Sequence, residues 1–216
     1  MQYKYTCPRQ YYFDNFTPYG KQRSTNEHLI FGSTMHEYFE EYNKGGDGVE
    51  LYRDFLMNEE PFGEHITNFE TILKKFNLER AVLSEQKIYD DEQDFVSIID
   101  AIYEKDGEYI IIDYKTGKFR KQDKKKYIQE LLLYVYAVER MTPLKISKIG
   151  MFFTGSPDDS FIQPVDRKKL QETLVELEEV RKKIENCEFP RNKTPLCAWC
   201  DYQGICEDYK DEIIAE

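Results

Sequence analysis

The sequence predicts an α/β fold with a mixed sheet of four to five strands flanked by helices. Helical periodicity of apolar residues dominates the chain up to about residue 78. Three short segments of strand-like residues then follow one another closely between 81 and 115. A helix, a further apolar strand and a long helix complete the order. This order of helices, three strands, helix, strand and helix is typical of an α/β domain with a mixed sheet.

Length and composition indicate a globular chain without a membrane-spanning segment. The 216 residues are enough for a large domain with its own core, and 40% are hydrophobic and 33% charged. The longest apolar run, 131–138, is far shorter than the ~20 residues that cross a bilayer. The N-terminus lacks the pattern of a secretion signal. We therefore expect one domain over residues 1–216, a cytoplasmic location and no membrane partner.

The helices are predicted from periodicity and from the residues that interrupt it. They are expected at about 33–42, 49–59, 65–78, 123–140 and 166–186. Ser33 is expected to cap the first of them, and the glycines at 45–48 to end it. Asp166 is expected to cap the last, and Pro190 follows its end.

The strands are expected at 81–89, 95–104, 108–115 and 146–154. Asp106 and Gly107 separate the second from the third and are typical of a tight hairpin turn. These two strands are therefore expected to be neighbours in the sheet.

Two aspartates and a lysine lie in this predicted hairpin. Asp100 lies inside an apolar strand, and Asp113 ends the next strand. Side chains alternate along a strand, so Asp113 and Lys115 share one side and Tyr114 faces away. The two carboxylates can then converge on one Mg²⁺ or Mn²⁺ ion, which offsets the cost of burying them. The alternative is that Asp113 only pairs with Lys115 at the sheet edge.

This arrangement resembles the PD-(D/E)XK nuclease superfamily, with Asp100 as the first acid and Asp113-Tyr114-Lys115 as the second acid with its lysine. More narrowly, it resembles the RecB-like branch, which includes CRISPR-associated RecB-like exonucleases and the nuclease domains of helicase–nucleases. Further elements match that branch in the same order along the chain: Cys7-Pro8 before a run of aromatic residues, Gly32 to His36, Leu131 to Tyr134, and Phe189-Pro190 before the last cysteines.

The resemblance implies a restriction-endonuclease-like core over about 28–185 and a metal site within it. The metal ligands would be the side chains of His36, Asp100 and Asp113 and the peptide carbonyl of Tyr114. An imidazole ligand suits Mn²⁺ somewhat better than Mg²⁺. Judged from its own residue type, a helical histidine such as His36 is more often a structural residue.

The resemblance also implies a catalytic set of Asp100, Asp113, Lys115 and Tyr134, in which Lys115 positions the attacking water. The family helix usually has a glutamine four residues before this tyrosine. Here Glu130 stands at that place and Gln129 precedes it. Either the helix is shifted by one residue or Glu130 replaces the glutamine. Glu85, on the preceding strand, is either an added acid or a surface residue.

Cysteines cluster near the C-terminus. Cys197, Cys200 and Cys206 have the spacing of ligands to one metal centre, and Cys187 stands outside the pattern. In the resembling nucleases an N-terminal cysteine, here Cys7, completes a [4Fe–4S] site, so a subdomain of about 1–20 and 187–210 would clasp the chain ends. A structural zinc site and free thiols are the alternatives.

The charge distribution singles out one basic loop in an acidic chain. The 30 Lys and Arg against 41 Asp and Glu give a net charge of −11, which argues against DNA affinity from bulk charge. The segment after the lysine is nonetheless basic, and it can follow a phosphate backbone. Its candidate nucleic-acid-binding residues are Lys118, Arg120, Lys121, Lys124 and Lys125. The alternative is a solvated helix start.

The resemblance implies a metal-dependent DNA nuclease that hydrolyses phosphodiester bonds. It would be an exonuclease on single-stranded DNA or DNA ends in recombination, repair or CRISPR adaptation, with DNA and a recombination, helicase or CRISPR-adaptation protein as partners. The rivals are a catalytically silent or partner-dependent DNA-binding protein with a nuclease fold, and a sequence-specific restriction enzyme.

Overall fold

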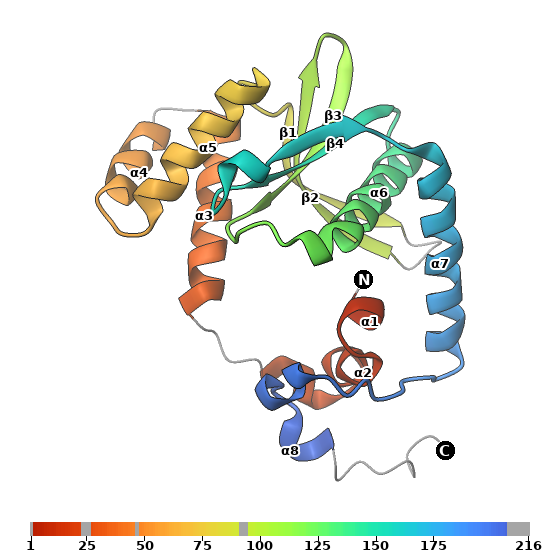
Figure 1. Ribbon diagram of the computed structural model, residues 1–216. Coiled ribbons are helices and arrows are strands. Elements are labelled where there is room, and N and C mark those ends of the chain that lie inside the picture. Colours follow the sequence, from red (N-terminus) through yellow and green to blue (C-terminus); the bar gives the residue numbers. More distant parts are fainter. Residues whose placement is uncertain (1, 23–26, 46–47, 91–94, 207–216) are drawn as a thin grey trace. The chain divides into compact units, whose positions relative to one another are not determined.

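The computed structural model describes residues 2–22, 27–45, 48–90 and 95–206 (Figure 1). The chain divides into two compact units. One combines Met1–Thr25 with Leu174–Glu216, and the other spans Asn26–Thr173. Among the described helices, none combines the length and the apolar character that crossing a membrane requires.

The unit Asn26–Thr173 is built on a five-stranded mixed sheet, as the sequence predicts. Its strands, in spatial order, are β1 (Leu83–Asp90), β2 (Phe95–Lys105), β3 (Glu108–Lys115), β4 (Ile146–Phe153) and β5 (Phe161–Pro164). Strands β3 and β4 are parallel, and the other neighbours are antiparallel. Asp106 and Gly107 have φ of 54° and 76°, which is the type I′ turn that joins a two-residue hairpin.

The helices of this unit are α3 (Glu27–Lys44), α4 (Gly48–Met57), α5 (Phe62–Phe76) and α6 (Lys124–Met141), and α7 (Arg167–Glu185) begins in it. The predicted Ser33 cap is wrong, because α3 starts at Glu27. The Ser33 hydroxyl lies inside the helix and donates to the carbonyl of Ile30 at 2.9 Å. The predicted Asp166 cap is confirmed, since its Oδ1 accepts the N–H of Lys169 at 3.1 Å.

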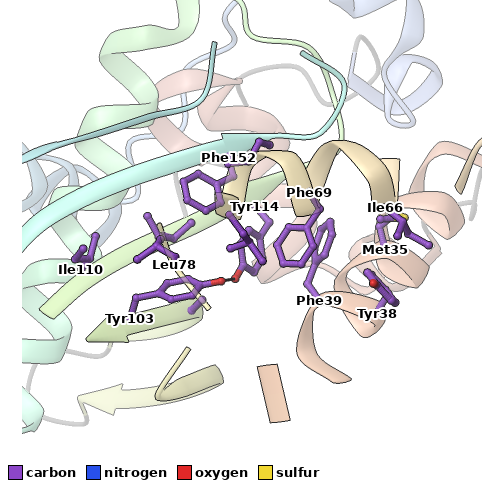
Figure 2. Close-up of a cluster of buried hydrophobic side chains, with 14 of the residues drawn as sticks. Met35, Tyr38, Phe39, Ile66, Phe69, Leu78, Tyr103, Ile110, Tyr114 and Phe152 are labelled. Carbon is purple, nitrogen blue, oxygen red and sulfur yellow. Dashed lines mark hydrogen bonds between the residues drawn. The ribbon is translucent and has the colours of Figure 1, made fainter. Parts of the chain in front are cut away.

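Helices α3 and α5 pack on the sheet through one buried cluster that is rich in aromatic rings (Figure 2). The cluster takes alternate residues of β3, namely Ile110, Ile112 and Tyr114. Asp113 lies between two of them and therefore points to the other face of the strand. Helix α6 also packs against β1, β3 and β4. Strand β3 is thus covered on both sides.

A small polar network lies inside this apolar cluster. The Asn43 side chain donates to the Tyr114 hydroxyl at 3.1 Å, and the hydroxyls of Tyr103 and Tyr114 are 2.7 Å apart (Figure 2). Asn43 Oδ1 also accepts the backbone N–H of Ala81 at 3.0 Å. Because buried polar groups are costly when unsatisfied, this network fixes the C-terminal end of α3 against β2 and β3.

The other unit brings the two ends of the chain together. It contains α1 (Gln2–Tyr5), α2 (Pro8–Phe16), the remainder of α7 and α8 (Gln203–Cys206). The Phe189 ring packs among aromatic residues of the first two helices, and its carbonyl accepts from Arg9 Nε at 2.9 Å. The Tyr202 hydroxyl donates to Asp14 Oδ1 at 2.6 Å. Segments far apart in the sequence therefore share one small core.

Candidate active site

Three acidic residues lie in a row across adjacent strands. The registers of β1 with β2 and of β2 with β3 place Glu85 opposite Asp100 and Asp100 opposite Asp113. Asp100 is 8% exposed and Asp113 only 2%. Glu85 has a φ of 47°, and regular ladder pairing is interrupted at this residue. A residue other than glycine rarely adopts a positive φ, and such backbone strain is found most often at functional positions.

Helix α3 adds an imidazole to this row. His36 Nδ1 lies 3.5 Å from Glu85 Oε1 and 3.7 Å from Asp100 Oδ1. One ligand atom from each of these three residues lies within 4.8 Å of the other two. An imidazole with two carboxylates can hold a transition-metal dication. The structure thus joins two predicted ligands, His36 and Asp100, with Glu85, which the sequence left open.

Asp113 lies beside this group and is held by the lysine. Lys115 Nζ is 3.0 Å from Oδ1 and 2.9 Å from Oδ2 of Asp113. Oδ2 is fully buried and accepts no hydrogen bond of proper geometry from the described residues. The backbone N–H of Tyr114 donates to Asp100 Oδ2 at 2.7 Å. Asp100, Asp113, Tyr114 and Lys115 therefore form one connected site.

Helix α6 brings two further side chains to Lys115. Glu130 Oε2 lies 3.8 Å from Lys115 Nζ, and the Glu130 carboxylate also lies near the Tyr134 phenol, whose pKa it helps to raise. Gln129 is buried instead. Glu130, and not Gln129, therefore faces Lys115.

Burial and like charge make this site electrostatically unfavourable without a cation. Burial raises the pKa of Asp113 to about 8, opposed by the ammonium of Lys115 and reinforced by the carboxylate of Asp100. Burial likewise raises the pKa of Asp100. Burial opposes protonation of His36, but the hydrogen bond to Glu85 and the nearby carboxylates outweigh it and raise its pKa. A divalent cation would relieve this repulsion, so these residues fit one.

Burial also acts on the lysine and on the tyrosine of the site. It lowers the pKa of Lys115, but the adjacent Asp113 and Glu130 carboxylates outweigh it, so the pKa is raised overall and the ammonium stays charged. Burial raises the pKa of Tyr134, and the surrounding carboxylates raise it further. The site therefore contains one permanent cation and a phenol that remains protonated.

A hollow of about 570 Å³ opens beside the site, lined by His36 and Lys115 and by residues of the basic loop. Lys118 and Arg120 are part of its lining. Lys121, Lys124 and Lys125 are exposed and do not line it. The structure therefore brings two of the five predicted nucleic-acid-binding residues to the hollow that His36 and Lys115 line.

The cysteines of the pattern meet in the unit that joins the chain ends. Cys7, Cys197, Cys200 and Cys206 line one cavity of about 180 Å³. Backbone N–H groups point at the sulfurs, from Asn192 to Cys7 at 3.4 Å and from Thr194 to Cys197 at 3.4 Å. Cys187 is exposed and lies outside the cavity lining.

Comparisons with known proteins agree with this geometry. The family model described as the PD-(D/E)XK nuclease superfamily matches residues 3–207. An ATP-dependent helicase/nuclease polypeptide of Clostridium botulinum is 33% identical over 109 residues, which is 50% of this chain but 7% of that protein. A crystal structure of a candidate exonuclease from Eubacterium rectale superposes with a TM-score of 0.54 at 16% identity, covering 85% of this chain and 77% of that one. The latter likeness concerns the fold.

Without metal, the stability of the protein should fall as the pH rises from about 4 to about 8. Asp113 has a pKa raised from 3.8 to about 8, so in this window the folded state keeps a proton that the unfolded state has released. Asp113→Asn removes this titration. In EDTA the variant should lose less stability over the window and exceed the wild type at about pH 8. Urea unfolding at both ends of the window measures this.

Added Mn²⁺ should stabilise the wild type more at about pH 8 than at about pH 5, because the ion competes with that proton. The exposed Asp158 supplies the control variant Asp158→Asn, which should behave as the wild type. Identical pH profiles for Asp113→Asn and the wild type would contradict the assignment.

Proposed function

The chain belongs to the PD-(D/E)XK nuclease superfamily, and from that membership we propose that it is a metal-dependent deoxyribonuclease that hydrolyses phosphodiester bonds. Nucleases of this superfamily use divalent metals and act on nucleic acid. The observation that carries the proposal is the position of Lys115. Its ammonium lies between the Asp113 and Glu130 carboxylates and lines the hollow that Lys118 and Arg120 share.

Each residue of the site has its own role in the proposed hydrolysis. His36, Asp100, Asp113 and the Tyr114 carbonyl would hold the cation, with Glu85 as a further ligand beside His36. A bound Mn²⁺ or Mg²⁺ ion polarises a phosphoryl oxygen and lowers the pKa of the attacking water. The Lys115 ammonium orients that water and stabilises the charge that develops on the phosphate. Tyr134, which stays protonated, lies beside Glu130 at the edge of this group.

The mode of action is proposed from the relatives. A matching segment in a helicase/nuclease polypeptide and a fold shared with a candidate exonuclease favour action on DNA ends or on single-stranded DNA, in recombination, repair or CRISPR adaptation. The substrate would then be supplied by a strand-separating or adaptation partner.

A partner-dependent DNA-binding protein is the second candidate function. Two observations favour it. Glu130 replaces the expected glutamine and adds a negative charge where a phosphate would approach. The chain also corresponds to only 7% of the helicase/nuclease relative, whose remaining parts this chain does not match. Activity that appears only with an added helicase would establish this alternative.

Cleavage of end-labelled DNA tests the main proposal. The protein, purified without oxygen, should degrade single-stranded DNA with Mn²⁺ or Mg²⁺ and not with EDTA. Asp113→Ala and Lys115→Ala should each lower the rate by about 10²-fold or more, because the first removes a ligand of the cation and the second removes the ammonium that stabilises the charge on the reacting phosphate. Lys168→Ala, a change at an exposed lysine of α7, is the matched control and should cut at the wild-type rate.

Two results would contradict the enzyme proposal or a part of it. Folded protein that cuts neither single-stranded nor duplex DNA with any metal is not a stand-alone nuclease. A Lys115→Ala variant that cuts at the wild-type rate would remove the assigned role of the lysine.

We further propose that Cys7, Cys197, Cys200 and Cys206 hold a [4Fe–4S] cluster that ties the chain ends together. Thiolates are the usual ligands of such clusters, and N–H groups directed at the sulfurs are typical around them. A structural zinc site on the same four thiolates is the alternative.

Iron and sulfide analysis tests the cluster. Protein purified without oxygen should contain about four iron and four sulfide per chain. Cys7→Ser should lose the iron, and Cys187→Ser, a change at an exposed cysteine outside the cavity, should keep it. Stoichiometric zinc without iron in the wild type would contradict the assignment.

A further inference from the structure

The hollow beside the candidate metal site is lined partly by residues that have no role in the proposed hydrolysis. Beyond His36 and Lys115, its lining continues along the basic loop to Tyr127 on the first turn of α6. Its volume of about 570 Å³ lies within the range of small-molecule sites, roughly 300–1,000 Å³. It is therefore large enough for a single nucleotide.

The aromatic side of the hollow is held rigidly. The Tyr127 ring packs against Phe119 at 6.2 Å and against Phe153 at 5.5 Å between ring centroids. Both Phe153 and Tyr127 line the hollow, but Phe153 is fully buried whereas Tyr127 is only partly buried. A ring that is supported from behind and open in front can serve as a stacking surface for a base.

The loop that follows β3 and lines the hollow is fixed by hydrogen bonds to the segment after β4. The N–H of Thr154 donates to the Lys115 carbonyl at 2.9 Å, and the N–H of Phe119 donates to Ser156 Oγ at 2.9 Å. At Gly155, a Cβ atom would come within 2.7 Å of the Thr116 carbonyl oxygen, so only glycine permits this close approach. The hollow is thus formed before any ligand arrives.

The charge of the lining suits a phosphate next to a base. Lys118 and Arg120 line the hollow against one acid, Asp123, whereas the charge of Lys115 is already paired with Asp113. This excess of positive charge contrasts with the net charge of −11 of the chain. Cations beside a stacking ring are the combination that single-stranded nucleic acid requires.

We propose that the hollow binds one unpaired nucleotide next to the phosphodiester bond that is cleaved, with its base stacked on Tyr127 and its phosphate between Lys118 and Arg120. This inference rests on the proposed nuclease function and names its substrate as DNA that is unpaired at the point of cleavage. A base within a duplex has both faces covered by its neighbours and offers none to Tyr127.

Binding in EDTA tests the inference without requiring cleavage. The probes are a fluorescent oligothymidylate of about 12 nucleotides and an abasic strand of the same length, compared by fluorescence anisotropy. The wild type should prefer the strand with bases by about tenfold or more. Tyr127→Ala should lose that preference and leave the affinity for the abasic strand unchanged, because only stacking is removed.

Matched variants separate stacking from other effects. Tyr127→Phe should bind as the wild type, and so should Tyr89→Ala, which removes an exposed tyrosine of β1 that does not line the hollow. Tyr127→Leu keeps an apolar side chain against Phe119 and Phe153. It should lose the preference for the strand with bases, as Tyr127→Ala does. It replaces Tyr127→Ala if that variant does not fold.

The inference is overturned if Tyr127→Leu weakens both strands equally or weakens neither. Its failure is distinguishable from failure of the nuclease proposal. Metal-dependent cleavage without any effect of Tyr127 on base binding overturns the inference alone. A preference for bases that depends on Tyr127, in a protein that cuts nothing, overturns the nuclease proposal alone.

Discussion

The burial of Asp113 beside Asp100 is the constraint on which the site depends. Two carboxylates in an apolar sheet repel one another and lose their hydration, and their raised pKa values express this cost. Lys115 compensates for part of it. A divalent cation between the acids and His36 would compensate for more, and the same cation would supply the polarisation that the proposed hydrolysis requires. Burial of these two carboxylates without a cation therefore lowers stability, whereas the proposed catalysis requires them at this place.

Strand β3 separates the core from the chemistry by alternation. Tyr114 points into the aromatic cluster (Figure 2). Its hydroxyl accepts a hydrogen bond from Asn43, whereas Asp113 and Lys115 contact one another on the other face of the strand. Asn43 lies about two turns of α3 beyond His36, on the same side of the helix. The buried Asn43–Tyr114 bond therefore ties the helix that bears the imidazole to the strand that bears the acids. Core packing therefore sets the position of a candidate metal ligand.

The turn residues and the alternation of side chains along the strands predicted the hairpin and the placement of its acids. The Asp106-Gly107 turn fixed the neighbours of Asp100 and Asp113, and alternation placed Lys115 with Asp113. The start of α3 was missed because Leu29 and Ile30 are exposed and break the amphipathic pattern. Strand β5 was missed because its four residues are too few to show a period.

The role of Glu85 and the choice between Glu130 and Gln129 needed tertiary structure. The placement of Glu85 depends on the register of β1 and on a left-handed backbone at that residue, neither of which periodicity reveals. Glu130 and Gln129 are adjacent polar residues on one helix, and only packing decides which of them faces Lys115.

The central claim is that the acids of β1, β2 and β3 and the imidazole of α3 form one cation site. A crystal structure with Mn²⁺, located by its anomalous scattering, tests this most directly. The account predicts a peak in contact with His36 and Asp100, with an Asp113 oxygen turned toward it. Strong peaks elsewhere and none at this site, in protein that cleaves DNA with Mn²⁺, would contradict it.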